Sequence, residues 1–154
     1  MLSEDIQEFL LWMRKKRMIR RYSDLIQIDS FIERYYYLKI HGNVGEETFG
    51  IDRYVNQMLY KSQRWRKIRN EVIIRDNACD LGVDGYELDN YIVVHHMNPI
   101  TLEDIEEERD IVFDTEYLIS CSSRTHEAIH FGDEGLLPKQ FTPRRPNDTC
   151  LWRN

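Results

Sequence analysis

Apolar side chains recur every three or four residues in three stretches of the first half of the chain, a spacing that is typical of helices with one buried face. The first stretch begins at Ser3 and ends in a run of cations, the second begins at Ser30 and runs to about Ile40, and the third spans 52–75. Serine favours the start of a helix over its interior, so Ser62 is expected to break the third stretch. The pattern therefore predicts an N-terminal set of helices.

Local signals mark the ends and the buried faces of these helices. Glu33 follows Ser30 at the spacing of a capping box, and Gly42 suits the left-handed conformation that often closes a helix. Trp65 lies on the apolar stripe of the third helix and is interpreted as a core residue. The cations that end the first stretch, residues 14–21, form either a solvated helix end or a surface that faces phosphates.

Short β-branched segments replace the helical pattern in the second half. Tyr91–Val94 and Tyr117–Ser120 predict two strands, and Arg124–Phe131 predicts a short helix that stops at Gly132. Between the strands, residues 101–110 are acidic and polar and form either a short helix or a loose loop. Helices followed by a strand–loop–strand–helix unit predict an α+β fold.

The chain divides into three regions on this pattern. Residues 1–59 form the N-terminal helical region, and residues 60–137 hold the two strands and the last helix. Residues 138–154 form a basic tail around Pro143-Arg144-Arg145-Pro146, which is expected to be extended on the surface or disordered.

Composition narrows the class of protein. Of the 154 residues, 42% are hydrophobic, which is enough for a core, while the strongest uncharged apolar stretch, 91–102, is far shorter than the roughly 18–20 residues of a membrane span. The N-terminus is acidic where a signal peptide is basic. The three cysteines are odd in number and lie far apart, which favours a reducing compartment. We therefore expect a cytoplasmic protein with no membrane partner.

The net charge of −6 is unevenly distributed. Residues 1–75 carry +5, residues 76–138 carry −14 and residues 139–154 carry +3. Two basic ends flank an acidic middle, so the overall acidity of the chain does not exclude nucleic acid as a partner.

Four of the five histidines fall in two pairs. His126 and His130 lie four residues apart on the predicted short helix, so both imidazoles project from one face and can reach one metal ion. His95 and His96 follow the first predicted strand, where neighbouring side chains point to opposite sides, so one of them can join the metal and the other is free for a different role. The alternative is four scattered histidines with separate structural roles.

The residues around these pairs resemble a known family. The runs that carry the resemblance are His95-His96-Met97-Asn98-Pro99-Ile100, Glu116-Tyr117-Leu118-Ile119 and His126-Glu127-Ala128-Ile129-His130. Together they resemble the ββα-metal motif of HNH endonucleases (the His-Me finger), in the three-histidine version of colicin-type DNases. Residues 60–79 are similar to the lead-in helix of small phage-encoded HNH proteins, so the resemblance covers residues 60–132.

The resemblance implies a role for each residue of the motif. His95, His126 and His130 would bind one divalent ion, and His96 would be the general base that deprotonates the attacking water. The ion would be Mg, Mn, Zn or Ni, since imidazoles bind transition metals strongly and such sites often work with magnesium or manganese. The implied activity is hydrolysis of DNA phosphodiesters, with the phage terminase as a further partner.

Two features depart from the family pattern. The family has an asparagine that orients the base histidine, and Tyr117 occupies that position in this chain. Tyrosine can donate one hydrogen bond but lacks the geometry of an amide. The two Cys-x-x-Cys pairs of many relatives are missing, since Gly82 follows Cys79 at that spacing and Ser122 and Thr125 replace the second pair. Without a structural zinc, the N-terminal helices are expected to supply the packing.

DNA contacts are expected from the cations that flank the acidic segment. The candidates are Arg64, Arg66, Lys67, Arg69, Arg75 and Arg124, with Arg144 and Arg145 of the tail. The acidic run 103–110 is interpreted as a solvated segment, with masking of the site as the alternative. A non-catalytic, metal-stabilised interaction module of a phage is the competing interpretation of the whole chain, and Tyr117 and the acidic surface motivate it.

Overall fold

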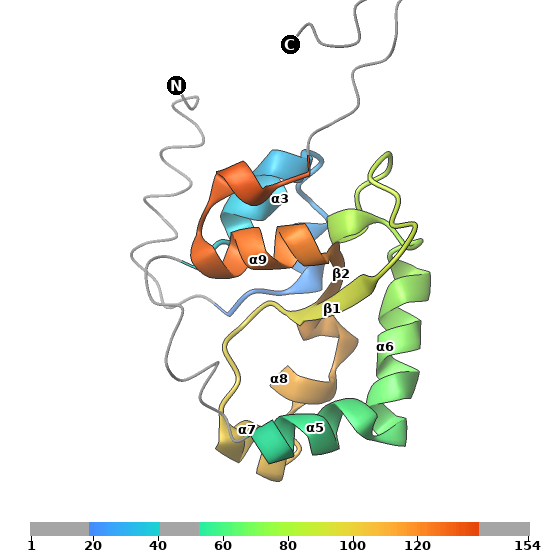
Figure 1. Ribbon diagram of the computed structural model, residues 1–154, viewed down its shortest axis with the longest axis vertical. Helices are drawn as coiled ribbons and strands as arrows, with labels where there is room; N and C mark the ends of the chain where they lie inside the picture. The colour runs from blue at the N-terminus through green and yellow to red at the C-terminus, as the bar shows by residue number, and fades with distance from the viewer. Residues whose placement is uncertain (1–18, 41–52, 139–154) are drawn as a thin grey trace, which may run out of the picture.

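The computed structural model describes residues 19–40 and 53–138. The predicted first helix from Ser3, the Gly42 cap and the basic tail lie outside the described residues. Figure 1 shows the arrangement of the elements, with η denoting a short 3-10 helix. In chain order they are α2 (Tyr22–Leu25), α3 (Phe31–Leu38), α5 (Arg53–Lys61), α6 (Gln63–Arg75), η1 (Asp80–Gly82), β1 (Ile92–His96), α7 (Leu102–Glu106), α8 (Asp110–Phe113), η2 (Thr115–Tyr117), β2 (Leu118–Ser122), α9 (Ser123–Phe131) and η3 (Glu134–Leu136).

The mixture of helices with a small antiparallel sheet confirms the α+β class. Strands β1 and β2 pair antiparallel, with His95 opposite Ile119 and His96 opposite Leu118. The first strand runs two residues beyond the predicted segment and so includes both histidines. No helix within residues 19–40 and 53–138 is long and apolar enough to cross a membrane.

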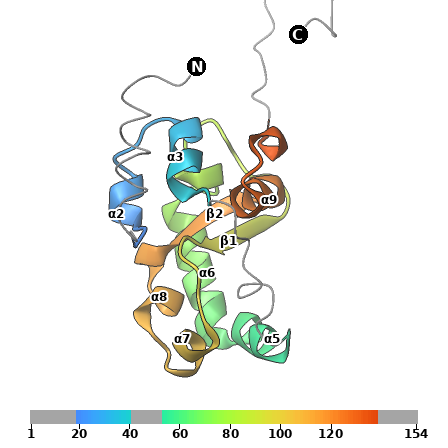
Figure 2. The same ribbon diagram turned by 90° about the vertical axis from the view of Figure 1, so that its left-hand side faces the viewer.

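The sheet separates two hydrophobic cores. Figures 1 and 2 show α3 and α9 on one side of β1 and β2, and α6 and α8 on the other. On one face lies the α3–α9 core, whose fully buried members include Leu25, Tyr35, Leu38, Leu81, Met97, Ile119, Cys121, Ala128 and Ile129. On the other face lies the α6 core, formed by Leu59, Trp65, Ile68, Val72, Val94, Ile100, Val112 and Leu118. Because side chains alternate along a strand, neighbouring residues of β1 belong to different cores.

Ser62 separates α5 from α6, as the sequence predicts. Its hydroxyl donates to the Leu59 carbonyl (2.7 Å) and accepts from the Trp65 N–H (3.1 Å), so one side chain ends one helix and caps the next. Trp65 is 3% exposed, which confirms it as a core residue.

One local prediction near a helix start is wrong. Ser30 precedes α3, but its side chain makes no capping hydrogen bond, so the capping box predicted with Glu33 is wrong. A capping box forms instead at Thr101 and Asp104, where each side chain accepts from the other residue's main-chain N–H (2.8 and 3.2 Å). Of the two alternatives for the acidic segment 101–110, the structure has the short helix, α7.

A buried carboxylate joins η1 to the start of α9. Asp80 accepts from the Thr125 hydroxyl (2.6 Å) and from the Ser122 N–H (3.2 Å), which ties η1 to the start of α9. Arg34 of α3 donates to the carbonyls of Leu81 (2.7 Å) and Gly82 (3.2 Å) on the same turn. Hydrogen bonds and the packing of α3 thus hold this turn against the end of β2 and against α9, the helix that carries His126 and His130.

Candidate metal centre

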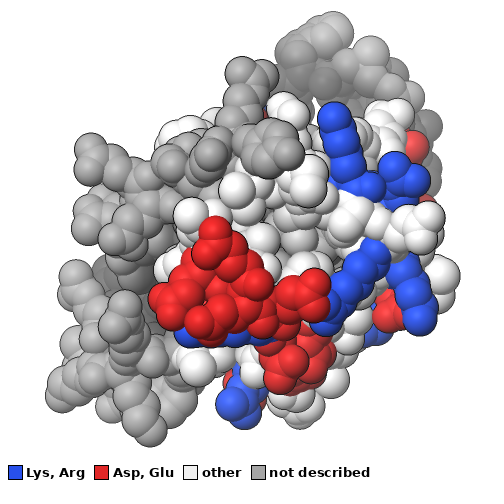
Figure 3. All heavy atoms as spheres, turned by 90° about the horizontal axis from the view of Figure 1, so that it is seen from below, with Lys and Arg blue, Asp and Glu red and all other residues white. Residues whose placement is uncertain are grey.

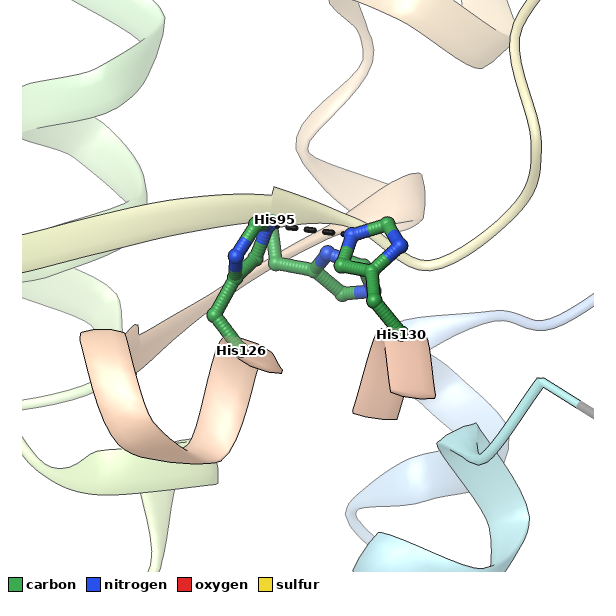
Figure 4. A group of neighbouring side chains, drawn as sticks. All are labelled: His95, His126 and His130. Atoms are coloured by element: carbon green, nitrogen blue, oxygen red, sulfur yellow. Dashed lines mark hydrogen bonds between the residues drawn. The ribbon is translucent and has the colours of Figure 1, made fainter. Parts of the chain in front are cut away.

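His95, His126 and His130 converge between the end of β1 and one face of α9. Figure 4 shows the three imidazoles turned toward one another. One nitrogen from each ring lies within 4.8 Å of the others, and the ring centroids are 4.4–5.1 Å apart. The structure therefore brings together the three predicted metal ligands.

Helix α9 is oriented by its caps and its buried face. Ser122 caps the start by accepting from the Thr125 N–H (3.0 Å), and Gly132 ends the helix in the left-handed region with φ 66°. Ala128 and Ile129 are fully buried in the α3–α9 core. Because residues four apart share a face, this packing leaves His126 and His130 together on the side of the helix that faces β1.

The geometry fits a metal ion bound by three imidazoles. A tetrahedral ion with metal–nitrogen bonds of about 2.0–2.1 Å holds its ligand nitrogens about 3.3 Å apart. The Nε2 atoms of His126 and His130 are 3.1 Å apart. His95 is 2% exposed, and its Nε2 has no hydrogen-bond partner among the described residues. A buried polar atom without a partner costs about 1–3 kcal/mol, and a bound cation would remove that cost.

The three imidazoles have lowered pKa values, which favour the neutral form that binds a metal. Burial holds the pKa of His95 well below its usual range, with smaller contributions from the charges of His126, His130, His96 and Arg20. Burial and then the charge of His130 lower the pKa of His126 to about 4. Burial also lowers the pKa of His130. At neutral pH the lone pairs are therefore available without loss of a proton.

His96 lies on the opposite face of β1, in the α6 core. Its ring stacks on the indole of Trp65, with centroids 5.1 Å apart and planes at 19°. Its Nε2 lies 3.1 Å from the carbonyl oxygen of Val112. A carbonyl can only accept a hydrogen bond, so Nε2 carries the proton and Nδ1 keeps the lone pair. Burial lowers the pKa of His96 to about 4, although the hydrogen bond to Val112 acts in the opposite direction.

Tyr117 does not partner His96 in the structure. Its carbonyl accepts from the Met97 N–H (3.0 Å) and its N–H donates to the Asp114 carbonyl (3.1 Å). Within the described residues, its hydrogen bonds are those of the main chain. The ring of His96 is bonded to the Val112 carbonyl instead. A main-chain partner leaves no signal in the sequence.

Arg75 is committed to the interior of the protein. Its guanidinium pairs with Asp76 (2.8 Å), donates to the carbonyls of Thr115 (2.7 Å) and Leu118 (2.8 Å), and lies over the ring of Tyr22. The Asp76 carboxylate is fully buried and also accepts from the Ser120 N–H (2.7 Å). The structure thus gives Arg75 a structural role at the base of β2.

The other cations expected to contact DNA differ in their surroundings. Arg64 pairs with Glu108 (2.8 Å) and lies over the ring of Phe113, and Arg69 donates to the Ile92 carbonyl (2.8 Å). The exposed members of the set are Arg64, Arg66, Lys67 and Arg124.

Figure 3 shows acidic side chains gathered in one patch, with Lys and Arg side chains beside it. The exposed acidic residues of α7, of the turn after it and of the start of α8 are Glu103, Glu106, Glu107, Glu108 and Asp110.

Comparisons of the chain with protein-family models, with curated proteins and with solved structures found no match.

Proposed function

We propose that this protein is a metal-dependent DNA endonuclease of the HNH type, with β1, β2 and α9 as its ββα-metal unit. The observation that carries the proposal is the convergence of three imidazoles, from His95, His126 and His130, next to a fourth imidazole at the following position of the strand. The resemblance of the surrounding runs to HNH endonucleases supports it further. A phage origin and work beside a packaging terminase in the host cytoplasm are part of the same proposal and rest on the resemblance alone.

The chain's own residues divide the chemistry between the two faces of β1. A divalent ion held by the three imidazoles would act as a Lewis acid on the scissile phosphate and stabilise the leaving oxygen. His96 presents Nδ1 as the proton acceptor for the attacking water, because Nε2 is bonded to Val112. The water oxygen bonds to phosphorus as the ester oxygen leaves, and the proton moves to Nδ1. The exposed cations Arg66, Lys67 and Arg124 would contact the flanking phosphates.

Plasmid nicking tests the proposal. Purified protein with added Mn²⁺ or Mg²⁺ is expected to convert supercoiled plasmid to open circles. His96→Gln, whose amide can still donate toward Val112, is expected to abolish nicking while the bound metal stays unchanged. Wild-type protein that holds metal and remains inert with both ions contradicts the nuclease proposal.

A non-catalytic, metal-stabilised interaction module is the second candidate. The stack of His96 on Trp65, its hydrogen bond to Val112, and the absence of a Tyr117 side-chain hydrogen bond within the described residues favour it. Under this alternative, the wild-type protein and His96→Gln are equally inert and both retain metal. A metal-dependent fold with no DNA role would in addition show no salt-sensitive DNA binding.

A further inference from the structure

We propose that the ring of Tyr60 stacks on an unpaired nucleobase of the DNA strand, next to the proposed cleavage site. The inference deepens the proposed function and rests on it for the identity of the strand. Tyr60 lies at the penultimate position of α5, and 46% of its surface is exposed. Neither the three-histidine centre nor the proposed base uses this side chain.

Two ring contacts connect Tyr60 to the proposed base. The phenol ring makes a T-shaped contact with the indole of Trp65, with centroids 5.2 Å apart and planes at 73°. Trp65 in turn stacks on His96, with centroids 5.1 Å apart. Trp65 is 3% exposed and has no room for a base, so Tyr60 is the exposed ring of this series. A nucleotide close to a scissile phosphate at His96 can therefore reach Tyr60.

The local fold holds Tyr60 in place before any ligand binds. The Ser62 hydroxyl donates to the Leu59 carbonyl (2.7 Å) where α5 ends, and Leu59 is buried in the α6 core. The contact with Trp65 covers at most one face of the Tyr60 ring, so the other face can take a base. A ring that is already held loses little conformational entropy on binding.

Positive charge next to Tyr60 suits the backbone of a nucleic-acid strand. The exposed cations at the end of α5 and the start of α6 are Lys61, Arg64, Arg66 and Lys67. Arg64 also pairs with Glu108 (2.8 Å), so the other three are the cations that lack an acidic partner on α7 or α8 among the described residues. Figure 2 shows α5 and α9 on the same side of the molecule, with β1 between them. A strand that crosses β1 from the metal centre therefore meets Tyr60 and these cations together.

The chemistry of the ring selects an unpaired base as its ligand. Aromatic rings combined with cations are the usual means of binding single strands, and stacking tolerates any sequence because every base has a flat face. Within a duplex, each base is already stacked on its neighbours and must leave the stack before a side chain can cover it. A locally unpaired strand is thus the form of DNA that Tyr60 fits.

Binding of a single-stranded oligonucleotide tests the inference, with a chelator present to prevent cleavage. Fluorescence anisotropy of a labelled oligothymidylate reports the affinity. Tyr60→Leu is expected to weaken binding by about tenfold, while Tyr60→Phe, which keeps the ring, should bind like the wild type. Tyr91→Leu is the matched control, because Tyr91 is 75% exposed and precedes the opposite end of β1 from His96. Equal affinity in wild type and Tyr60→Leu overturns the proposal.

Two further ligands separate stacking from contact with phosphates. An abasic oligonucleotide keeps its phosphates and loses its bases, so wild type and Tyr60→Leu should bind it equally. A duplex closed by hairpins at both ends offers no unpaired base outside its loops of non-nucleotide linker, and the two proteins should bind it equally as well. The slope of log affinity against log salt for the single strand should be the same in both proteins, because stacking releases no counterions. A similar loss on all three ligands in Tyr60→Leu overturns the stack.

Photocrosslinking of the wild-type protein decides the question if Tyr60→Leu does not fold. A single-stranded oligonucleotide that contains 5-bromouracil is irradiated in complex with the protein, and mass spectrometry locates the crosslinked residue. A crosslink at Tyr60 is expected. Crosslinks that spare Tyr60 overturn the proposal.

The outcomes for the stack and for the nuclease are distinguishable. Base-dependent binding through Tyr60 without plasmid nicking retains the stacking site and rejects the nuclease. Plasmid nicking by the wild type, together with unchanged single-strand affinity in Tyr60→Leu, retains the nuclease and rejects the stacking site.

Discussion

The imidazole of His96 lies against the indole of Trp65 with ring centroids 5.1 Å apart and planes at 19°. Trp65 comes from the first turn of α6 and His96 from the last position of β1, so the stack joins a helix to the sheet. The Val112 carbonyl fixes the same ring through Nε2. The orientation of the proposed base therefore comes from a core aromatic and a main-chain carbonyl.

Replacement of Trp65 by leucine is expected to lower the nicking rate of the folded protein, beyond any loss caused by a lower free energy of unfolding. The variant loses the flat surface that fixes the plane of His96, so the base is less often aligned. Plasmid nicking should fall by about tenfold or more under conditions where the protein is fully folded, with metal affinity unchanged. Trp65→Phe retains a ring and should keep most of the activity.

Val72→Ala is the control for the tryptophan series. Val72 is fully buried in the same α6 core, and the truncation is expected to cost about 1–3 kcal/mol of unfolding free energy. Its nicking rate, measured while folded, should match the wild type. If Trp65→Leu and Val72→Ala lose activity in proportion to their loss of stability, the stack has no role in positioning the base.

The sequence predicted the elements of the candidate site well, because short-range patterns determine them. The four-residue spacing of His126 and His130 and the alternation of His95 and His96 are consequences of helix and strand geometry. Both appear in the structure, as does the helix break at Ser62. The class of the fold followed from the order of these elements.

The partners of His96 and Arg75 could not be predicted from the sequence. The Val112 carbonyl belongs to the main chain of α8, and main-chain carbonyls are present at every residue, so nothing in the sequence marks this one. Val112 lies just beyond the acidic run 103–110, so it is α8 that positions His96. Arg75 is one of many cations on α6, and only the three-dimensional placement of Asp76 and Tyr22 makes it structural.

Loss of one imidazole is expected to abolish metal-dependent stabilisation. Removing a direct ligand, as in His126→Gln, should weaken binding more than the roughly 10–100-fold that follows loss of an outer partner. Zn²⁺ at about 1,000 times its Kd adds about 4 kcal/mol to the unfolding free energy of the wild type. Thermal unfolding with Zn²⁺ and with a chelator measures the difference. Glu127→Gln, an exposed neighbour on α9, should behave as wild type, and an unchanged zinc shift in His126→Gln contradicts the site.

The metal-free protein is expected to lose stability as the pH falls below about 6.5. The pKa values of His96 and His126 are about 4 in the folded chain, below the value near 6.5 of an unfolded histidine. The unfolded chain therefore binds more protons between these values, and each histidine lowers the unfolding free energy by up to about 1.4 kcal/mol per pH unit. The contribution is fully present above pH 6.5 and declines down to about pH 4.

Urea unfolding at a series of pH values between 7.5 and 4.5 measures this dependence. In the metal-free state, the unfolding free energy of His126→Gln should fall less steeply with decreasing pH than that of the wild type. The variant's unfolded chain takes up one proton fewer, because glutamine does not titrate. Bound Zn²⁺ should move the decline of the wild type to lower pH, since protons compete with the metal for the same lone pairs. A midpoint that stays constant or rises toward pH 4.5 contradicts the burial of neutral imidazoles.

Salt dependence of DNA binding distinguishes surface cations from the structural arginine. Arg66 and Lys67 are exposed on α6, and the double variant to glutamine should reduce the slope of log affinity against log salt by about 2. Arg75→Gln should leave the slope unchanged, because its guanidinium bonds Asp76, Thr115 and Leu118. It should instead cost about 3–5 kcal/mol of unfolding free energy, since the buried Asp76 carboxylate loses its cation. A slope that falls by about 1 in folded Arg75→Gln would mean that Arg75 leaves these partners to contact phosphate.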